Sequence, residues 1–114
     1  MVRIYHNQRC SKSRATLALL EERGGVIEVV DYLETPPDAA ELAVLLQQLS
    51  MPARGLLRTG EAEYQSLGLA DPSLDEASLI ATMVAHPKLI ERPIVVANGK
   101  AAIGRPPEAV LTIL

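Results

Sequence analysis

The sequence has 114 residues, the length of one domain with a single hydrophobic core. Hydrophobic residues make up 48% of it, but there is no Phe or Trp and only three Tyr, so aliphatic side chains must form that core. The net charge of −3 gives no general attraction to nucleic acids or to anionic membranes. The single cysteine excludes an intramolecular disulfide and a zinc site built on several thiolates.

The sequence contains no apolar run approaching the roughly 20 residues of a membrane helix. Polar residues begin at His6, which is too early for a signal peptide. A lone thiol is typical of a reducing compartment. We therefore expect a soluble, cytoplasmic protein with neither a membrane nor a nucleic acid as partner.

The first thirty residues have the pattern of a βαβ unit. Residues 2–5 are β-prone, residues 11–23 are mostly good helix formers, and residues 26–30 are again β-prone. The pair Gly24-Gly25 ends the predicted helix, as glycine commonly does just past a helix C-terminus. A crossover of this length predicts that the two strands run parallel.

The middle of the chain is helical in pattern. Thr35 is the predicted N-cap of a helix with Pro36 at its first position. The apolar stripe of that helix consists of Leu42, Leu45, Leu46 and Leu49. Residues 53–70 read as short helical pieces, and Ser73 with Glu76 has the spacing of a capping box that opens one more helix.

The last third returns to strands. Residues 94–97 and 100–103 flank an Asn-Gly pair, which predicts a hairpin with a type I′ turn. A short helix follows the prolines at 106 and 107, with Val110, Leu111 and Leu114 on one side. The order is βαβ, a helical insert at about 36–88, then ββα. That order predicts a single α/β domain over 1–114 with a thioredoxin-like fold and a mixed four-stranded sheet.

Cys10 is the strongest candidate for chemistry, because it stands between the first strand and the first helix. Unpaired backbone N–H groups and the positive end of the helix dipole favour a thiolate there. Arg9, Lys12 and Arg14 add positive charge, and Ser13 offers a hydroxyl. The alternative is a buried, inert cysteine that fills space. The polar neighbours favour an exposed, reactive thiol.

Three arginines are candidates for binding an oxyanion, because a guanidinium forms paired, charge-assisted hydrogen bonds with tetrahedral anions. Arg92 precedes the predicted hairpin, Arg105 follows it, and Arg58 ends a short helical piece. Each alone is equally explained as a solvated surface charge. His6 is a candidate for tuning the thiol or relaying a proton, although a solvent-facing loop histidine explains it as well. No spaced set of metal ligands and no phosphate-binding glycine loop is present.

Taken as a set, four motifs resemble the ArsC family of glutaredoxin-coupled arsenate reductases, and within it the chromosomal, YfgD-like branch. They are His6-Asn7-x-x-Cys10-Ser-x-Ser13-Arg14, Tyr32-Leu33-Glu34-x-Pro36-Pro37, Glu91-Arg92-Pro93-Ile94-Val95-Val96 and Gly104-Arg105-Pro106. The resemblance runs from Ile4 to Leu114. Three positions depart from the family pattern: Gln8 stands where many relatives have proline, Lys12 where the plasmid-borne enzymes have a smaller residue, and Gly104 where some arsenate reductases have a second cysteine. Because Gln8 and Lys12 flank Cys10, they bear on the substrate.

The resemblance implies that Cys10 attacks arsenate to form a thiol–arsenate adduct. It further implies that three arginines bind the oxyanion (Arg58, Arg92 and Arg105) and that three residues support the site (His6, Ser13 and Pro93, which is cis in this fold). Glutathione then displaces arsenic as a co-substrate, and glutaredoxin resolves the mixed disulfide. No tightly bound cofactor and no metal is implied. A single cysteine agrees with this scheme, because it needs an external thiol to complete a redox cycle.

Two other functions stay open. A glutathione-dependent thiol oxidoreductase would use the same chemistry on another substrate. A non-catalytic regulator of the Spx type, which docks on RNA polymerase, has the same fold. Those regulators typically carry a Cys-x-x-Cys switch, whereas residue 13 is serine here. We expect an arsenate reductase that is a monomer.

Overall fold

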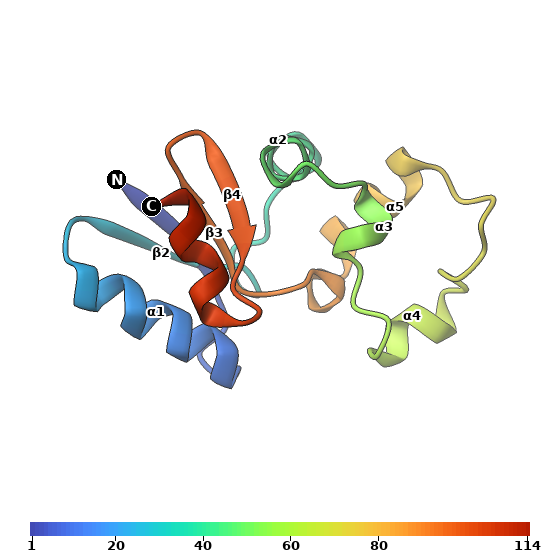
Figure 1. The fold of residues 1–114 in the computed structure, drawn as a ribbon. Coiled ribbons are helices and arrows are strands. Elements are labelled where there is room, and N and C mark those ends of the chain that lie inside the picture. The colour runs from blue at the N-terminus through green and yellow to red at the C-terminus, as the bar shows by residue number, and fades with distance from the viewer. The chain divides into compact units, whose positions relative to one another are not determined.

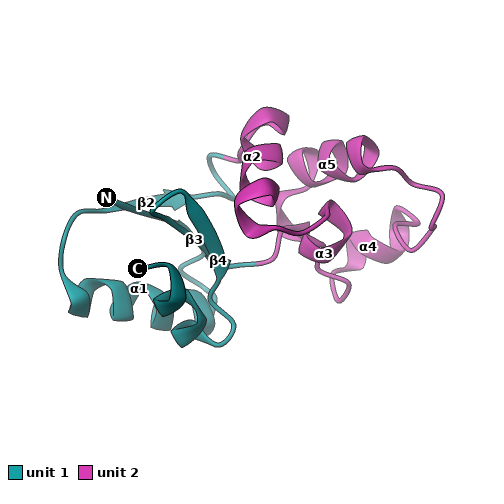
Figure 2. Cartoon of the chain, turned by 45° about the horizontal axis from the view of Figure 1, so that its top comes forward, with its two compact units in different colours: residues 1–35, 92–114 teal, residues 36–91 magenta.

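The computed structural model describes all 114 residues, and the chain divides into two compact units (Figure 2). Unit 1 consists of residues 1–35 and 92–114, and unit 2 consists of residues 36–91. Unit 2 therefore interrupts unit 1 in the sequence, at the place where the helical insert is expected.

Unit 1 contains all the strands, and its elements are β1 (Val2–His6), α1 (Ser11–Arg23), β2 (Ile27–Asp31), β3 (Ile94–Ala97), β4 (Lys100–Ile103) and η2 (Pro107–Ile113) (Figure 1). The strand order in the sheet is β2-β1-β3-β4. β1 and β2 are parallel, whereas β1–β3 and β3–β4 are antiparallel. This confirms the predicted mixed four-stranded sheet and its βαβ and ββα halves. Asn98 and Gly99 have φ angles of 55° and 74°, as the predicted hairpin turn requires.

The core of unit 1 lies on one face of the sheet, against α1 and η2. Ile4 pairs with Val95 across β1 and β3, and both side chains are fully buried. Leu20 from α1 and Val110 from η2 pack with them. The terminal helix differs from expectation, because η2 is a 3₁₀ helix whose buried side chains are Val110 and Ile113. Leu111 is 41% exposed, since a repeat of three residues turns it away from the core.

Unit 2 is helical, with α2 (Ala39–Leu49), α3 (Ala53–Leu56), α4 (Ala62–Ser66), α5 (Glu76–Ala85) and η1 (Pro87–Leu89). The predicted stripe of α2 buries Leu42, Leu45 and Leu46. The short pieces predicted for residues 53–70 are α3 and α4. The longest helix of the whole chain is α1 with 13 residues, and none has the length and apolar character to cross a membrane.

The helix caps of unit 2 correct two predictions. The N-cap of α2 is Asp38, whose side chain accepts a hydrogen bond from the Glu41 backbone N–H at 2.8 Å, and not Thr35. The N-cap of α5 is Asp75, and not Ser73 of the predicted capping box. In both places an aspartate nearer the helix competes successfully for the first turn, because aspartate is among the best N-cap residues.

Candidate active site

Four segments of unit 1 meet at one edge of the sheet. β1 and β2 are parallel, so the loop that carries Cys10 lies at the same edge as Asp31, the last residue of β2. β3 is antiparallel to β1, so it begins at that edge, just after Arg92. β4 pairs Ile103 with Ile94 and so ends there, just before Arg105. The topology alone therefore gathers a thiol, a carboxylate and two guanidinium-bearing residues.

Cys10 is the N-cap residue of α1, with φ −96° and ψ 121°. A turn holds its backbone: its N–H donates to the Asn7 carbonyl at 3.0 Å, and its carbonyl accepts from Arg14 N–H at 3.0 Å. The sulfur makes no capping hydrogen bond. Cys10 is only 7% exposed, so the expectation of an exposed thiol is wrong. Its polar neighbours Arg9 and Lys12 are exposed, but the cap residue itself lies within the fold.

Arg105 provides the charge that reaches the sulfur. Its Nη2 donates to Sγ of Cys10 at 3.6 Å, within the range of hydrogen bonds to sulfur. Its Nε donates to the carbonyl oxygen of Arg92 at 2.8 Å. The backbone before Pro93 therefore fixes the guanidinium that faces the thiol. The Arg92–Pro93 bond is cis, as the family resemblance implies, and so is Arg105–Pro106, which no sequence signal indicated.

Gly104 permits the close approach of these segments. A Cβ atom at this position would collide with the Thr16 hydroxyl of α1 and would lie 2.8 Å from Cγ of Pro93. The Gly104 N–H donates to the Pro93 carbonyl at 2.9 Å. In the sequence this glycine opens the Gly104-Arg105-Pro106 motif, but nothing there indicates a close contact with α1. The burial of Thr16 in α1, which brings the contact about, has no sequence signal of its own.

His6 and Ser13 form a second hydrogen-bonded group beside the Cys10 loop. His6 Nδ1 and Ser13 Oγ are 2.6 Å apart, and the Asn7 backbone N–H donates to the same hydroxyl at 3.0 Å. The Ser13 hydroxyl is thus directed at His6 and the loop backbone rather than at the sulfur. Burial lowers the pKa of His6 below 6.5, with Arg14 adding to the effect and Asp31 opposing it. The neutral imidazole is therefore favoured.

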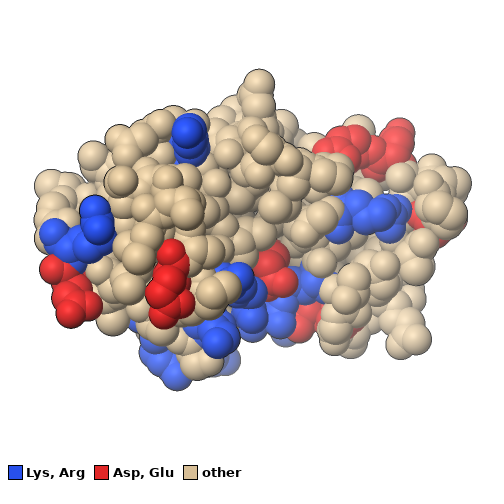
Figure 3. Space-filling model, in the orientation of Figure 1, with Lys and Arg blue, Asp and Glu red and all other residues tan.

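Basic side chains surround the N-terminal end of α1, and Figure 3 shows Lys and Arg gathered over that end of the helix. Arg9, Lys12 and Arg14 are all exposed. Arg14 also braces the loop, because its Nη1 donates to the Gln8 carbonyl at 2.9 Å. This arrangement suits an anion arriving at a thiolate, since positive charge offsets the repulsion between them.

A comparison with models of protein families identifies the family of this chain. The model of the ArsC family matches residues 5–113, nearly the entire chain. The chain belongs to the ArsC family.

Individual relatives of this ArsC family member agree with that assignment. YfgD of Escherichia coli K12 is 64% identical, and the match covers 99% of this chain and 96% of YfgD. A protein named arsenate reductase from Neisseria meningitidis serogroup A is 53% identical, covering 99% and 97%. The solved structure of an arsenate reductase from Vibrio cholerae superimposes with a TM-score of 0.97 at 55% identity, covering 99% and 97%. This likeness confirms the predicted thioredoxin-like fold.

Arg58, the third arginine of the family motif, lies in unit 2, between two carboxylates. Its Nη1 is 3.6 Å from Oε2 of Glu61, and its Nε is 3.6 Å from Oε1 of Glu91. Its backbone N–H donates to the Leu89 carbonyl at 2.8 Å. Side chain and backbone of Arg58 are thus both held within unit 2, and a role at the Cys10 site stays a prediction.

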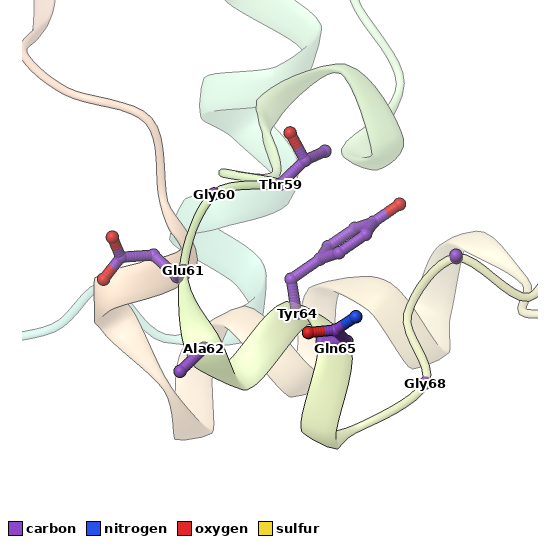
Figure 4. A pocket seen from close by; sticks show the side chains of 8 residues that line it. Thr59, Gly60, Glu61, Ala62, Tyr64, Gln65 and Gly68 are labelled. Atoms are coloured by element: carbon purple, nitrogen blue, oxygen red, sulfur yellow. The ribbon is translucent and has the colours of Figure 1, made fainter.

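Unit 2 also has a cavity of about 390 Å³ beside α4 (Figure 4). Thr59, Tyr64 and Gln65 line it, and the side chain of Glu61 points away from the Tyr64 ring (Figure 4). Its lining has no cationic side chain and no cysteine. No three His, Cys, Asp or Glu side chains anywhere in the chain come together as a metal site.

Proposed function

We propose that this protein is an arsenate reductase whose nucleophile is Cys10. The observation that carries the proposal is the contact between the Cys10 sulfur and the Arg105 guanidinium, 3.6 Å apart at the N-terminus of α1. A cation at this distance stabilises a thiolate and offers further N–H donors to an anion beside it. The names of relatives at 53% and 55% identity support arsenate as that anion.

In the first step, the Cys10 thiolate attacks arsenic(V) of arsenate. A sulfur–arsenic bond forms, and one hydroxyl of arsenate leaves and takes up a proton to become water. Both reactants are anionic, so the step requires positive charge fixed before the reaction begins. Arg105 already has that position, because the Arg92 carbonyl holds its Nε. Arg92 is the second oxyanion-binding arginine in this proposal, and the family resemblance implies the same role for Arg58.

In the second step, a glutathione thiolate attacks the sulfur of Cys10. A disulfide forms, the sulfur–arsenic bond breaks, and its electron pair stays on arsenic, which leaves as arsenite. Arsenic(V) gains two electrons and the two sulfurs together lose two. Glutaredoxin then reduces the mixed disulfide, because the chain has no second cysteine that would resolve it. This cycle needs a reducing thiol pool, so we place the monomeric enzyme in the cytoplasm.

The test is arsenate-dependent oxidation of NADPH by the purified protein, coupled through glutathione, glutaredoxin and glutathione reductase. The Cys10→Ser variant should lose all turnover, because a hydroxyl is not a comparable nucleophile. Arg23→Gln, at the other end of α1, is the control and should keep the wild-type rate.

Each component of the assay is also omitted in turn. Turnover that persists in Cys10→Ser would refute the proposal. Wild-type turnover without glutaredoxin would refute the resolving step alone. An inactive wild type whose Cys10 still exchanges with disulfides would assign the same thiol chemistry to another substrate.

A further inference from the structure

A cavity of about 220 Å³ adjoins the Cys10 loop. Asn7, Gln8 and Arg9, the three residues before Cys10, line one side, and the other side follows β2 with Asp31, Leu33 and Glu34. All six lie in unit 1. None of them is assigned a step in the chemistry proposed above.

The position of this cavity follows from the strand order. β1 lies between β2 and β3, so the loop after β1 has the end of β2 on one side and the start of β3 on the other. The cavity lies on the β2 side. Arg105, which contacts the sulfur, comes from the β3–β4 side. Cys10 thus stands between the cavity and its arginine partner in the order of the strands.

The lining of the cavity has opposite charges that are not used within the protein. Arg9 and Glu34 are exposed, and neither side chain forms an ion pair. Asp31 uses Oδ1 to accept from the Leu33 N–H at 3.1 Å, which leaves its other oxygen for a ligand. Leu33 adds an apolar wall that is 37% exposed. A ligand that fits has an ammonium and a carboxylate close together, joined to a short aliphatic chain.

We propose that this cavity binds the γ-glutamyl end of glutathione, with the ammonium at Glu34 and Asp31 and the carboxylate at Arg9. The inference rests on the proposed function for its reductant. Displacement at sulfur is in-line, so the incoming thiolate must approach Cys10 from the side opposite the departing arsenic. If the arginines hold arsenic on the β3–β4 side, the thiol must arrive from the β2 side. The cavity lies there and has the charges that recognise an amino-acid end group.

The test uses disulfide exchange, which requires no arsenate. The Cys10 thiolate attacks glutathione disulfide, one glutathione thiolate leaves, and the protein–glutathione mixed disulfide is followed by mass spectrometry. Hydroxyethyl disulfide, which has no charges, is the reference oxidant. The ratio of the two rates removes any general change in the reactivity of Cys10. N-acetylated glutathione disulfide, which lacks the ammonium, tests the part assigned to Glu34.

Glu34→Gln and Arg9→Gln should each lower the ratio of the glutathione disulfide rate to the hydroxyethyl disulfide rate about threefold, as expected for a partly exposed charge contact. The double variant should lower it about tenfold, because the free energies of two independent contacts add. Arg23→Gln and Glu22→Gln, which remove one charge of each sign at the far end of α1 and outside the cavity, should leave it unchanged. Glu34→Gln should cause no further loss with the N-acetylated disulfide.

Three results would overturn the inference: equal rates with both disulfides in the wild type, no exchange with either, or ratios in the cavity variants that match the controls. Because the exchange assay contains no arsenate, its result can still be interpreted if the protein fails to reduce arsenate. A reductase that is active with arsenate but shows no cavity effect would refute the glutathione subsite alone.

Discussion

Replacing Gly104 with alanine tests the packing that brings Arg105 to Cys10. The added methyl would collide with the Thr16 hydroxyl and lie 2.8 Å from Cγ of Pro93 and 3.1 Å from Cγ2 of Thr16. Neither neighbour is a flexible end, because Thr16 and Pro93 are buried and the hydroxyl donates to the Lys12 carbonyl at 2.8 Å. Overpacking of this kind costs about 1–3 kcal/mol of unfolding free energy.

The assay is urea unfolding, in which a loss of about 2 kcal/mol lowers the midpoint by about 1 M at a typical m value. Gly60→Ala is the control, because no atom lies within 4 Å of the place that its new methyl would take and its φ is not in the left-handed region. We expect its free energy of unfolding to change by no more than about 0.5 kcal/mol, which is the effect of an ordinary surface substitution. Gly104→Ala should also slow alkylation of Cys10, since a shift of residue 104 carries Arg105 with it.

A double-mutant cycle with Thr16→Ala separates this collision from other effects. Thr16→Ala alone loses the bond to the Lys12 carbonyl, which costs about 1 kcal/mol. In the double variant, Thr16→Ala vacates the space that the new methyl of residue 104 needs. The loss of unfolding free energy in the double variant should therefore be about 1 kcal/mol smaller than the sum of the two single losses. Losses that simply add would show that the methyl does not meet Thr16 and would refute the packing argument.

Three other predictions concern a proton, a cap and the arginines. The free energy of unfolding should fall as pH drops below about 6.5 and level off below the folded-state pKa of His6. The reason is that burial lowers the pKa of His6 in the folded protein, so the unfolded state binds more protons in this pH range. His6→Gln should flatten this dependence in urea titrations at a series of pH values. Asp38→Ala should cost about 1 kcal/mol in urea unfolding, whereas Thr35→Ala should cost less than 0.5 kcal/mol, about the limit for a surface change. Arg105→Gln should slow alkylation of Cys10 by iodoacetamide about tenfold, since a hydrogen bond to a charged group is worth about 1.5 kcal/mol. Arg92→Ala should slow it less, because the carbonyl that holds Arg105 remains; equal losses would contradict this.

Most of the fold is predictable because its signals are local. The Asn98-Gly99 turn, the glycines after α1 and the apolar spacing in α2 each act within a few residues. The errors arose where two local signals compete. Thr35 and Asp38 are both good N-cap residues, and a short sequence pattern does not determine which of them begins α2. Thr35 is the last residue of the first segment of unit 1, and α2 begins only after Asp38. The 3₁₀ form of η2 was missed for a similar reason, since a three-residue repeat and an α-helical stripe differ little over seven residues.

The site is predictable only in part, because its contacts join distant residues. Cys10 at the start of a helix is a local signal, and the strand order brings Arg105 to the same edge. The burial of the thiol was not predictable from neighbours that are themselves exposed. The contact of Gly104 with Thr16 spans the sheet and α1, so only the folded chain reveals it.

The two arginines that flank the hairpin look equivalent in the sequence, but the structure gives them different tasks. Arg105 reaches the sulfur with its side chain, while Arg92 contributes its carbonyl to hold that side chain. A carbonyl is present whatever residue stands at position 92, so this part of the site depends on backbone geometry and not on the arginine side chain. The backbone is fixed in turn by the Gly104 bond to the Pro93 carbonyl. A guanidinium held in this way is positioned before any anion arrives, and that is the condition under which a fixed charge lowers the barrier to attack by a thiolate.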